Sequence, residues 1–461
     1  MVDNTYRRRP GLHPAVIALS YIMIVAAPLI LAVSTGRTGR GLIKDFAHAI
    51  GMIAYDMLLA QFVLSSRFEA VSGHIGIDVL MRFHQLAART LAVLIVLHPI
   101  LMTGRVAILD VYEAPNYFLS IVQNPKFLTG IIAFLLVLTL IATSLGRRFF
   151  KIPYEIWRAL HGLLALGIAG FGWHHAISVG RYSKNSPLAE FWTILFALAA
   201  ATLVFIYFIK PLLLLRHPYR VVSNDKIGEK IHEITLTPNG NHQLRYAPGQ
   251  FAWVNFRKYP FSLLDHPFSI ASNPTNNKNI SFIIQEDGDF TKNIESIPKG
   301  HVAYLDAPHG NFTLAGRNGT AIGLIAGGVG IAPILSILRY LRATNDPRPI
   351  RLIYGAKKKN KLISVKEIEK MKIALDLQTT YALFDPPINW PGKSGNITRQ
   401  RLINYIFIGF NVILIVLALA FAIYVFEGQW AHSKPGGIHQ QDHHKKHQQR
   451  LRRGPGKQNS Y

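Results

Sequence analysis

Two apolar stretches decide the architecture of this chain: MRFHQLAARTLAVLIVLHPI (residues 81–100) and RALHGLLALGIAGFGWHHAI (residues 158–177). Each is long enough to cross the hydrocarbon core of a membrane as one α-helix. Each also carries two histidines 14 positions apart, His84 and His98 in the first, His161 and His175 in the second. Fourteen residues of α-helix rise about 21 Å and turn about 1400°, so both members of a pair lie within roughly 40° of one face.

Matched histidine pairs on two membrane helices predict two haems, one above the other, because imidazole is a common axial ligand of haem iron. The predicted ligands are His84, His98, His161 and His175. A single histidine in a membrane helix can instead be a hydrogen-bonded packing residue, but the repeated spacing favours the haem interpretation. His174 is an alternative to His175, since a regular helix favours His175 and a π-bulge would favour His174.

The apolar residues are unevenly distributed along the 461 positions. Half of all residues are hydrophobic and 16% are charged, yet residues 1–215 are mostly apolar runs and the sequence to about residue 400 is typical of soluble protein. Hydropathy predicts six spans, at 14–33, 42–64, 83–104, 127–145, 156–179 and 189–215. An even number places both ends of the membrane domain on one side. Lysine and arginine lean towards the N-terminal side, which favours a multi-pass membrane protein with its soluble part in the cytoplasm.

Charge and cysteine content exclude several function classes. The formal net charge is +25, but no nucleic-acid-binding motif accompanies it, so we attribute the excess to lipid headgroups and predict no nucleic-acid partner. The chain has no cysteine, which excludes disulfides, zinc–thiolate sites, iron–sulfur clusters and thiol nucleophiles. The first apolar run lacks a small-residue cleavage site, so we expect a span rather than a cleavable signal peptide.

The soluble part begins as β-structure and ends as α/β-structure. Residues 216–315 alternate short β-like segments with glycine, proline and asparagine turns, which predicts a β-barrel domain. Residues 316–403 contain a buried strand, a glycine turn, a helix and another strand, the start of a nucleotide-binding α/β domain that is apparently truncated. A further apolar run at 404–426 predicts a possible seventh span, and 427–461 is a basic tail rich in histidine and glutamine, which we expect to be disordered rather than metal-binding.

The glycine turn lies between a strand and a helix. Gly327, Gly328 and Gly330 would let the backbone approach a phosphate closely at the start of the helix. The alternative is an ordinary strand-to-helix connection, and Pro333 fits either interpretation.

A second motif, DHPFSIAS at residues 265–272, is more specific. With it, the chain resembles the ferric reductase and NADPH oxidase group, whose soluble half is similar to ferredoxin–NADP⁺ reductase. The resemblance implies that Ser269 lies near the isoalloxazine N5 of FAD and that His266, Pro267 and Phe268 help to hold the flavin. The resemblance covers about residues 42–400, and the group carries haem-binding histidine pairs on its third and fifth helices.

Other motifs agree with this resemblance. The turn at residues 248–251 matches the group's Pro-Gly-Gln-Phe element. Gly288 and Thr291 resemble the element expected at the FAD pyrophosphate. Residues 306–310 depart from the usual Gly-Pro-Tyr-Gly but keep the proline and the last glycine. Residues 327–333 resemble the nicotinamide-nucleotide loop. The implied fold is a six-helix transmembrane bundle, a β-barrel FAD-binding domain and a partial α/β nucleotide-binding domain.

The leading functional hypothesis is a transmembrane oxidoreductase that uses NADPH or NADH, FAD and two haems b. Electrons would pass to ferric iron or oxygen, between which the sequence does not choose. With a cytoplasmic N-terminus, His84 and His161 would hold the inner haem, and His98 and His175 the outer one. Arg82 or Arg158 would contact haem propionates or, alternatively, lipid headgroups.

One departure leaves a second hypothesis open. The group closes its nucleotide domain with a Cys-Gly-Pro segment, whereas this chain has no cysteine. The nucleotide domain could then be inactive, and the chain a haem and flavin electron-transfer subunit fed by a partner reductase. A homo-oligomer also remains open. An ion or solute channel is disfavoured, because the intramembrane ionisable residues are mainly paired histidines.

Overall fold

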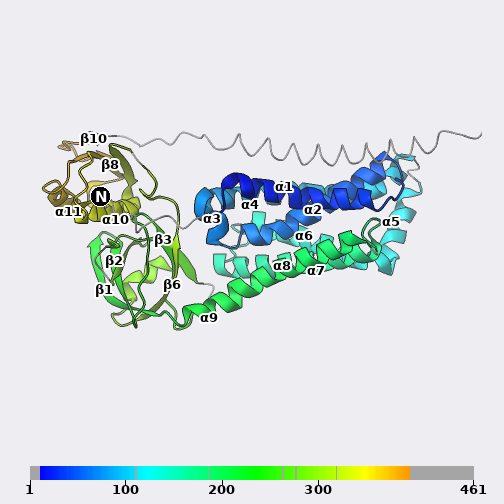
Figure 1. Cartoon of the computed structure of the whole chain (residues 1–461), viewed down its shortest axis with the longest axis horizontal. Helices are drawn as coiled ribbons and strands as arrows, with labels where there is room; N and C mark the ends of the chain where they lie inside the picture. Colours follow the sequence, from blue (N-terminus) through cyan, green and yellow to red (C-terminus); the bar gives the residue numbers. More distant parts are fainter. Residues whose placement is uncertain are drawn as a thin grey trace, which may run out of the picture.

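The computed structural model describes residues 11–109, 112–184, 186–261, 264–275, 278–317 and 319–394. The seventh span expected at 404–426 and the tail at 427–461 lie outside the described residues. The described chain forms a helical half followed by two β-containing units, which lie together at one end of the helices (Figure 1).

Six helices among the described residues are long and apolar enough to cross a membrane, as hydropathy predicts. They are α1 (Pro14–Ser34), α2 (Leu42–Leu64), α4 (Ile77–Leu109), α6 (Leu128–Gly146), α7 (Tyr154–Val179) and α8 (Pro187–Val204). In five of them only 11% to 28% of the most apolar window is buried, although these helices are hydrophobic. Apolar side chains left on the outside are expected where a helix faces lipid tails, and a helix satisfies its own backbone hydrogen bonds there.

Helix α2 is the centre of the bundle, with 78% of its most apolar window buried. α4 packs mainly against α2, whereas α7 packs mainly against α6. α3 (Glu69–Ile75) and α5 (Ala114–Gln123) connect spans at opposite ends of the bundle (Figure 1). α4 begins at Ile77, earlier than predicted, because a polar turn with Asp78 and Arg82 3.8 Å apart precedes the apolar run.

The last span runs directly into the soluble half. α8 continues through a π-turn, η3 (Phe205–Ile209), into α9 (Lys210–Leu214), and β1 begins at Tyr219. Figure 1 shows α9 leading from the bundle to the β domain.

The first soluble unit is a six-stranded sheet in the order β4-β3-β6-β1-β2-β5. Its strands are β1 (Tyr219–Gly228), β2 (Ile231–Pro238), β3 (Phe251–Asn255), β4 (Asp265–Ser269), β5 (Ile280–Gln285) and β6 (Val302–His309). All pairings are antiparallel, and a single bridge between Ile270 and Phe282 links the two outer strands. The sheet therefore curls into a barrel-like form around an apolar core without a continuous closing ladder.

The second soluble unit is a parallel sheet in the order β10-β9-β8-β7. It contains β7 (Ile322–Gly327), β8 (Ile350–Ala356), β9 (Leu377–Leu383) and the short β10 (Lys393–Ser394), with α10 (Ile331–Ala343) and α11 (Val365–Met371) between strands. Alternate residues of β7 and β8 are buried, and α10 buries most of its apolar residues in the same core. Ser336 on α10 donates a hydrogen bond to the carbonyl of Ser272 (2.7 Å), which ties the two soluble units together.

Candidate functional site

The four predicted haem ligands form two layers within the helix bundle. His84 and His161 each lie seven residues after the first residue of α4 and α7. His84 lies within electrostatic range of His161, and His98 within electrostatic range of His175. The four histidines therefore lie at two depths of the bundle, about 21 Å apart along the helices. We call them the near layer (His84, His161) and the far layer (His98, His175), by their distance from the soluble units.

The far layer lies against two glycines. A Cβ atom at Gly51 of α2 would lie 2.6 Å from Nδ1 of His98, and one at Gly130 of α6 would lie 2.5 Å from Nδ1 of His175. Any larger residue would push the imidazoles out of place. The Nδ1–H of His98 donates to the carbonyl of Ala47 (2.7 Å), which leaves Nε2 with the free electron pair needed to bind a metal.

The other three imidazoles have an unused buried nitrogen. Nδ1 of His84, His161 and His175 is buried and has no hydrogen-bond partner among the described residues. His174 differs, because its side chain is exposed and its two ring nitrogens lie 3.2 Å from the Thr129 hydroxyl and 3.4 Å from the Ser178 hydroxyl. An imidazole on each of two helices suits axial ligation of haem iron, and the partly buried His175 fits this role better than the exposed His174.

The predicted flavin residues form β4 and its surroundings. β4 pairs with β3, which places Pro267 opposite Trp253 and Ser269 opposite Phe251. The imidazole of His266 stacks on the ring of Phe290, with centroids 4.3 Å apart and planes 14° apart. Burial lowers the pKa of His266, and its Nε2 has no partner in the part of the chain that the structure describes.

Strand pairing also unites motifs that are far apart in the sequence. Residue Phe251 of the turn at 248–251 pairs with His309 of the segment at 306–310. The side chain of Gln250 donates to the carbonyl of Gly310 (3.1 Å). Gly249 has a φ of +96°, and a Cβ there would lie 1.9 Å from the carbonyl oxygen of Phe312, so this turn requires glycine.

A cleft of about 450 Å³ joins the flavin residues to the membrane domain. His266, Gly288 and Thr291 line it on one side, and the loop between α6 and α7 lines it on the other. That loop contributes three cations, Arg147, Arg148 and Lys151. In the sequence these cations contribute only to the bias of lysine and arginine towards one side of the membrane, and the adjacent arginines in a short loop are the one local sign of a binding role.

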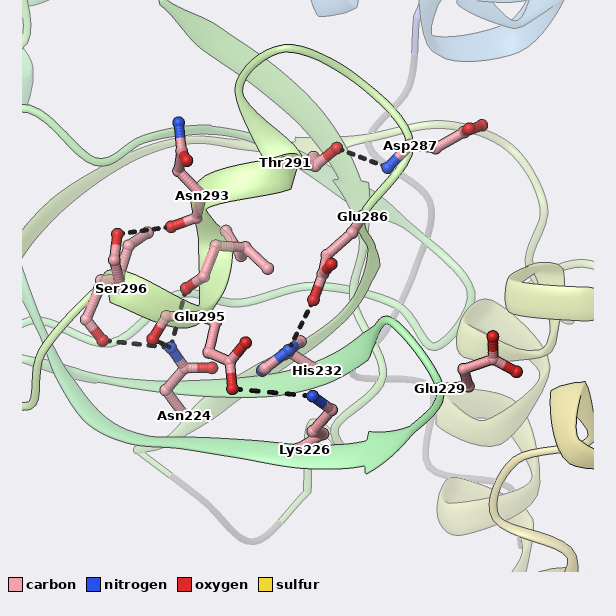
Figure 2. Close-up of polar contacts among 12 residues, drawn as sticks. Asn224, Lys226, Glu229, His232, Glu286, Asp287, Thr291, Asn293, Glu295 and Ser296 are labelled. Atoms are coloured by element: carbon pink, nitrogen blue, oxygen red, sulfur yellow. Dashed lines mark hydrogen bonds and ion pairs between the residues drawn. The ribbon is translucent and has the colours of Figure 1, made fainter.

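The Gly288–Thr291 turn is held in shape by its own polar groups. The Thr291 hydroxyl accepts hydrogen bonds from the backbone N–H of Asp287 (3.0 Å) and Gly288 (2.8 Å). His232 contacts Glu286 (3.1 Å) just before the turn, and Asn224 donates to the carbonyl of Ile294 (2.9 Å) just after it (Figure 2).

A cluster of His232, Glu286 and Glu295 lies beneath this turn, with ligand-type atoms within 4.8 Å of one another. Lys226 already lies 3.7 Å from Glu295 and supplies a positive charge there (Figure 2). We therefore interpret the cluster as a set of contacts that stabilises the turn, and not as a metal site.

The glycine turn of the second soluble unit leaves open space above its backbone. A Cβ at Gly327, Gly328 or Gly330 would meet no atom within 4 Å. Gly328 has a φ of +51°, and Pro333 lies in the first turn of α10. The open backbone beside a helix N-terminus suits a phosphate group.

Ion pairs connect the barrel-like unit to the membrane helices. Asp265 pairs with Arg67 and Arg158, and Asp306 pairs with Lys210 (2.6 Å). Burial raises the pKa of the Asp265 carboxyl, but the two arginines lower it more, and the net pKa is below the ordinary value. Arg158 is thus occupied by a carboxylate of the soluble half, and Arg82 pairs with Asp78.

Three family models match successive parts of the chain. Residues 50–172 match the ferric reductase like transmembrane component, residues 227–302 match an FAD-binding domain, and residues 324–415 match an oxidoreductase NAD-binding domain. The first match includes His84, His98 and His161 and ends just before His174 and His175.

Curated relatives match the soluble half. The chain is 32% identical over 141 residues to the reductase component of propane 2-monooxygenase from Mycolicibacterium goodii, covering 30% of this chain and 40% of that protein. It is 31% identical to the electron transfer subunit of dihydroorotate dehydrogenase B from Caldanaerobacter subterraneus, covering 27% of this chain and 47% of that protein. The chain thus spans less than half the length of these relatives. A probable flavin reductase from Aliivibrio fischeri is 30% identical, covering 37% of this chain and 72% of that protein.

Among solved structures, the FAD/NAD-binding domain of a nitric oxide dioxygenase from Vibrio cholerae is similar to the same half. It is 18% identical, with a TM-score of 0.34, covering 43% of this chain and 92% of that domain.

Proposed function

We propose that this chain carries electrons from NAD(P)H across the membrane. The chain belongs to the ferric reductase and NADPH oxidase group, because it joins a ferric reductase-like transmembrane domain to FAD- and NAD-binding domains. The domain set is that of a membrane oxidoreductase. The proposal adds the haems, the direction of transfer and the acceptor, which is ferric iron or oxygen.

The observation that carries the proposal is that α4 and α7 each carry two histidines at matching depths of one bundle, with the near layer close to the start of α7, which lines the cleft. Each layer offers one imidazole from α4 and one from α7. Bound there, haem iron would carry one electron at a time, and FAD would take up a hydride and release its electrons singly. The protein's own contribution is to fix the distances between the sites.

The chain's residues would hold FAD at two places. His266, Pro267, Phe268 and Ser269 would line the isoalloxazine ring. The turn from Gly288 to Thr291 would contact the pyrophosphate.

Arg147 and Arg148 would supply positive charge to the pyrophosphate from the other side of the cleft. The flavin would therefore bridge the membrane domain and the barrel-like unit.

The nucleotide would bind at the glycine turn. Gly327, Gly328 and Gly330 would let its phosphates approach the backbone, and α10 would direct its N-terminus at them, with Pro333 completing the first turn. The basic loop at residues 147–151 lies on the same side as the soluble units, which favours a cytoplasmic position for them.

The first test is a reduced-minus-oxidised absorption spectrum of the full-length protein in detergent or nanodiscs. We expect a b-type signal from two haems per chain. A protein that is fully folded and carries no haem after expression with added haem precursor would contradict the proposal.

A second test separates the enzyme from a subunit fed by a partner reductase. We expect NADPH or NADH to reduce the bound FAD in anaerobic stopped-flow measurements. Flavin that stays oxidised with excess of both nucleotides, but is reduced by dithionite and passes electrons to haem, would instead support the partner-fed subunit.

A further inference from the structure

One carboxylate joins three elements at the boundary between the membrane and soluble halves. Asp265 is the first residue of β4 and directly precedes His266. Its Oδ1 accepts a hydrogen bond from Arg158 (2.7 Å), and its Oδ2 accepts one from Arg67 (2.5 Å). The side chains of all three residues are only 17% to 19% exposed.

Each arginine lies close to one of the candidate cofactor sites. Arg158 lies on α7, one helical turn before His161 of the near layer. Arg67 follows α2, and its guanidinium lies 3.4 Å above the ring of Trp253, which pairs across strands with Pro267. The Asp265 carboxylate therefore connects β4 directly to α7, the helix that carries His161 of the near layer.

Such a cluster is sensitive to the loss of its central charge. Two partly buried arginines share a single carboxylate, and removing that carboxylate leaves two cations close together in a partly desolvated site. Among the described residues, contacts that do not involve Asp265 also hold this boundary, including Lys210 with Asp306 (2.6 Å) and the Asn311 amide with the carbonyl of His74 (2.9 Å). Loss of Asp265 should therefore loosen the boundary without detaching the soluble half.

We propose that Asp265 is a positioning residue, which holds β4 against α7 and the end of α2 and so fixes the distance between the flavin and the near layer. The inference rests on the proposed function. Electron transfer slows steeply with distance, so the step from flavin to haem depends on Asp265, whereas reduction of the flavin by the nucleotide does not.

The main test compares Asp265→Asn with Asp346→Asn in the full chain in nanodiscs. Asp346 is a matched control, because its carboxylate also pairs with an arginine (Arg348, 2.7 Å) but lies in the nucleotide-binding unit. In anaerobic stopped-flow measurements we expect Asp265→Asn to slow haem reduction at least tenfold and to leave flavin reduction within twofold. We expect Asp346→Asn to change neither step, and Asp265→Glu to restore part of the rate.

A second readout does not need the cofactors. Because the chain has no native cysteine, Ala70→Cys on α3 and Lys299→Cys on the barrel-like unit give two unique sites for spin labels. Both positions are exposed. We expect the measured distance distribution to broaden with Asp265→Asn and to stay unchanged with Asp346→Asn.

The outcomes separate the two proposals. Unchanged haem reduction together with an unchanged distance distribution in Asp265→Asn would overturn the positioning role. Loss of FAD binding in that variant would overturn it too, because Asp265 would then bind the flavin. If the unmodified protein carries no haem, the proposed function fails, and the spin-label distances still decide whether Asp265 positions the soluble half.

Discussion

The histidine layers and the flavin cleft are built in opposite ways. Each layer takes one residue from each of two long helices, and the spacing within each helix sets the depth of both layers. The cleft combines residues from the loop at 147–155, the strand at 265–269 and the turn at 288–291, which meet only in the folded chain. Geometry within one regular element can be predicted from the sequence, and geometry between domains cannot.

The two regions also differ in charge. The layers are imidazoles inside an apolar bundle, whereas the cleft contains three cations near the membrane boundary. Substitution of a histidine in either layer should therefore abolish binding of the haem in that layer. Substitutions in the cleft should act gradually and depend on salt.

The strongest test of the layers is removal of a near-layer ligand. We expect His84→Ala or His161→Ala to remove the inner haem and to reduce electron transfer across the membrane by more than about 100-fold, since changes behind a metal ligand alone cost about 10–100-fold. Haem content and the rate of acceptor reduction measure this. His174→Ala is the control and should retain both haems; a protein that keeps two haems without His84 would show that the layers were misassigned.

A glycine substitution tests whether the far layer is as tightly fitted as the contacts indicate. Gly130→Ala places a Cβ 2.5 Å from the His175 ring, so we expect weaker outer haem binding and an altered paramagnetic resonance signal. Gly104→Ala is the matched control, because a Cβ there meets nothing within 4 Å. Equal spectra for the two variants would contradict the predicted ligation by His175.

Substitutions in the cleft should weaken FAD binding without abolishing it. We expect the double change Arg147→Ala and Arg148→Ala to weaken FAD binding by about tenfold, or about 1.4 kcal/mol, because the two exposed or half-exposed cations are partly screened by solvent. Flavin fluorescence titration at low and high salt measures the effect, which should shrink as salt rises. Arg351→Ala, a surface change in the nucleotide-binding unit, should leave FAD affinity unchanged.

The second boundary ion pair, between Asp306 and Lys210, should make the stability of the fold depend on pH. Burial raises the pKa of Asp306, but hydrogen bonds from His309 and Lys210 outweigh burial and lower the pKa to about 2. The unfolded value is about 3.9, so Asp306 stabilises the fold by about 2 kcal/mol above pH 4, and this contribution is lost as the pH falls towards 2.

Thermal unfolding of the full chain between pH 3 and pH 7 measures this contribution. We expect Asp306→Asn to be less stable than the unmodified protein at pH 7 and to approach it at pH 3. A difference that stays constant over this range would mean that the carboxylate charge is not the source of the stability.

Much of the fold and part of the site could be predicted from the sequence. The six apolar runs predict the six long helices, and the helical period predicts the two depths at which the histidines of α4 and α7 lie. Strand pairing brings the turn at 248–251 and the segment at 306–310 together, as their shared resemblance to one flavin domain suggested.

The rest required contacts between distant residues. Asp265 lies 198 positions from Arg67 and 107 from Arg158, and no local pattern marks either pairing. The sequence suggests haem propionates or lipid headgroups as partners of Arg158, whereas the structure pairs it with Asp265 of the soluble half. Asp56, fully buried in α2 and hydrogen-bonded to Trp192 (2.6 Å), was missed because one carboxylate does not interrupt a hydropathy window.

The helix that runs from α8 through the π-turn and α9 ends four residues before β1, and this short connection has a mechanical consequence. If α8 tilts to match the thickness of the bilayer, the attached six-stranded sheet should change its orientation relative to the membrane. A change in lipid composition would thereby alter the position of β4, which carries the predicted flavin residues, without any ligand or partner protein.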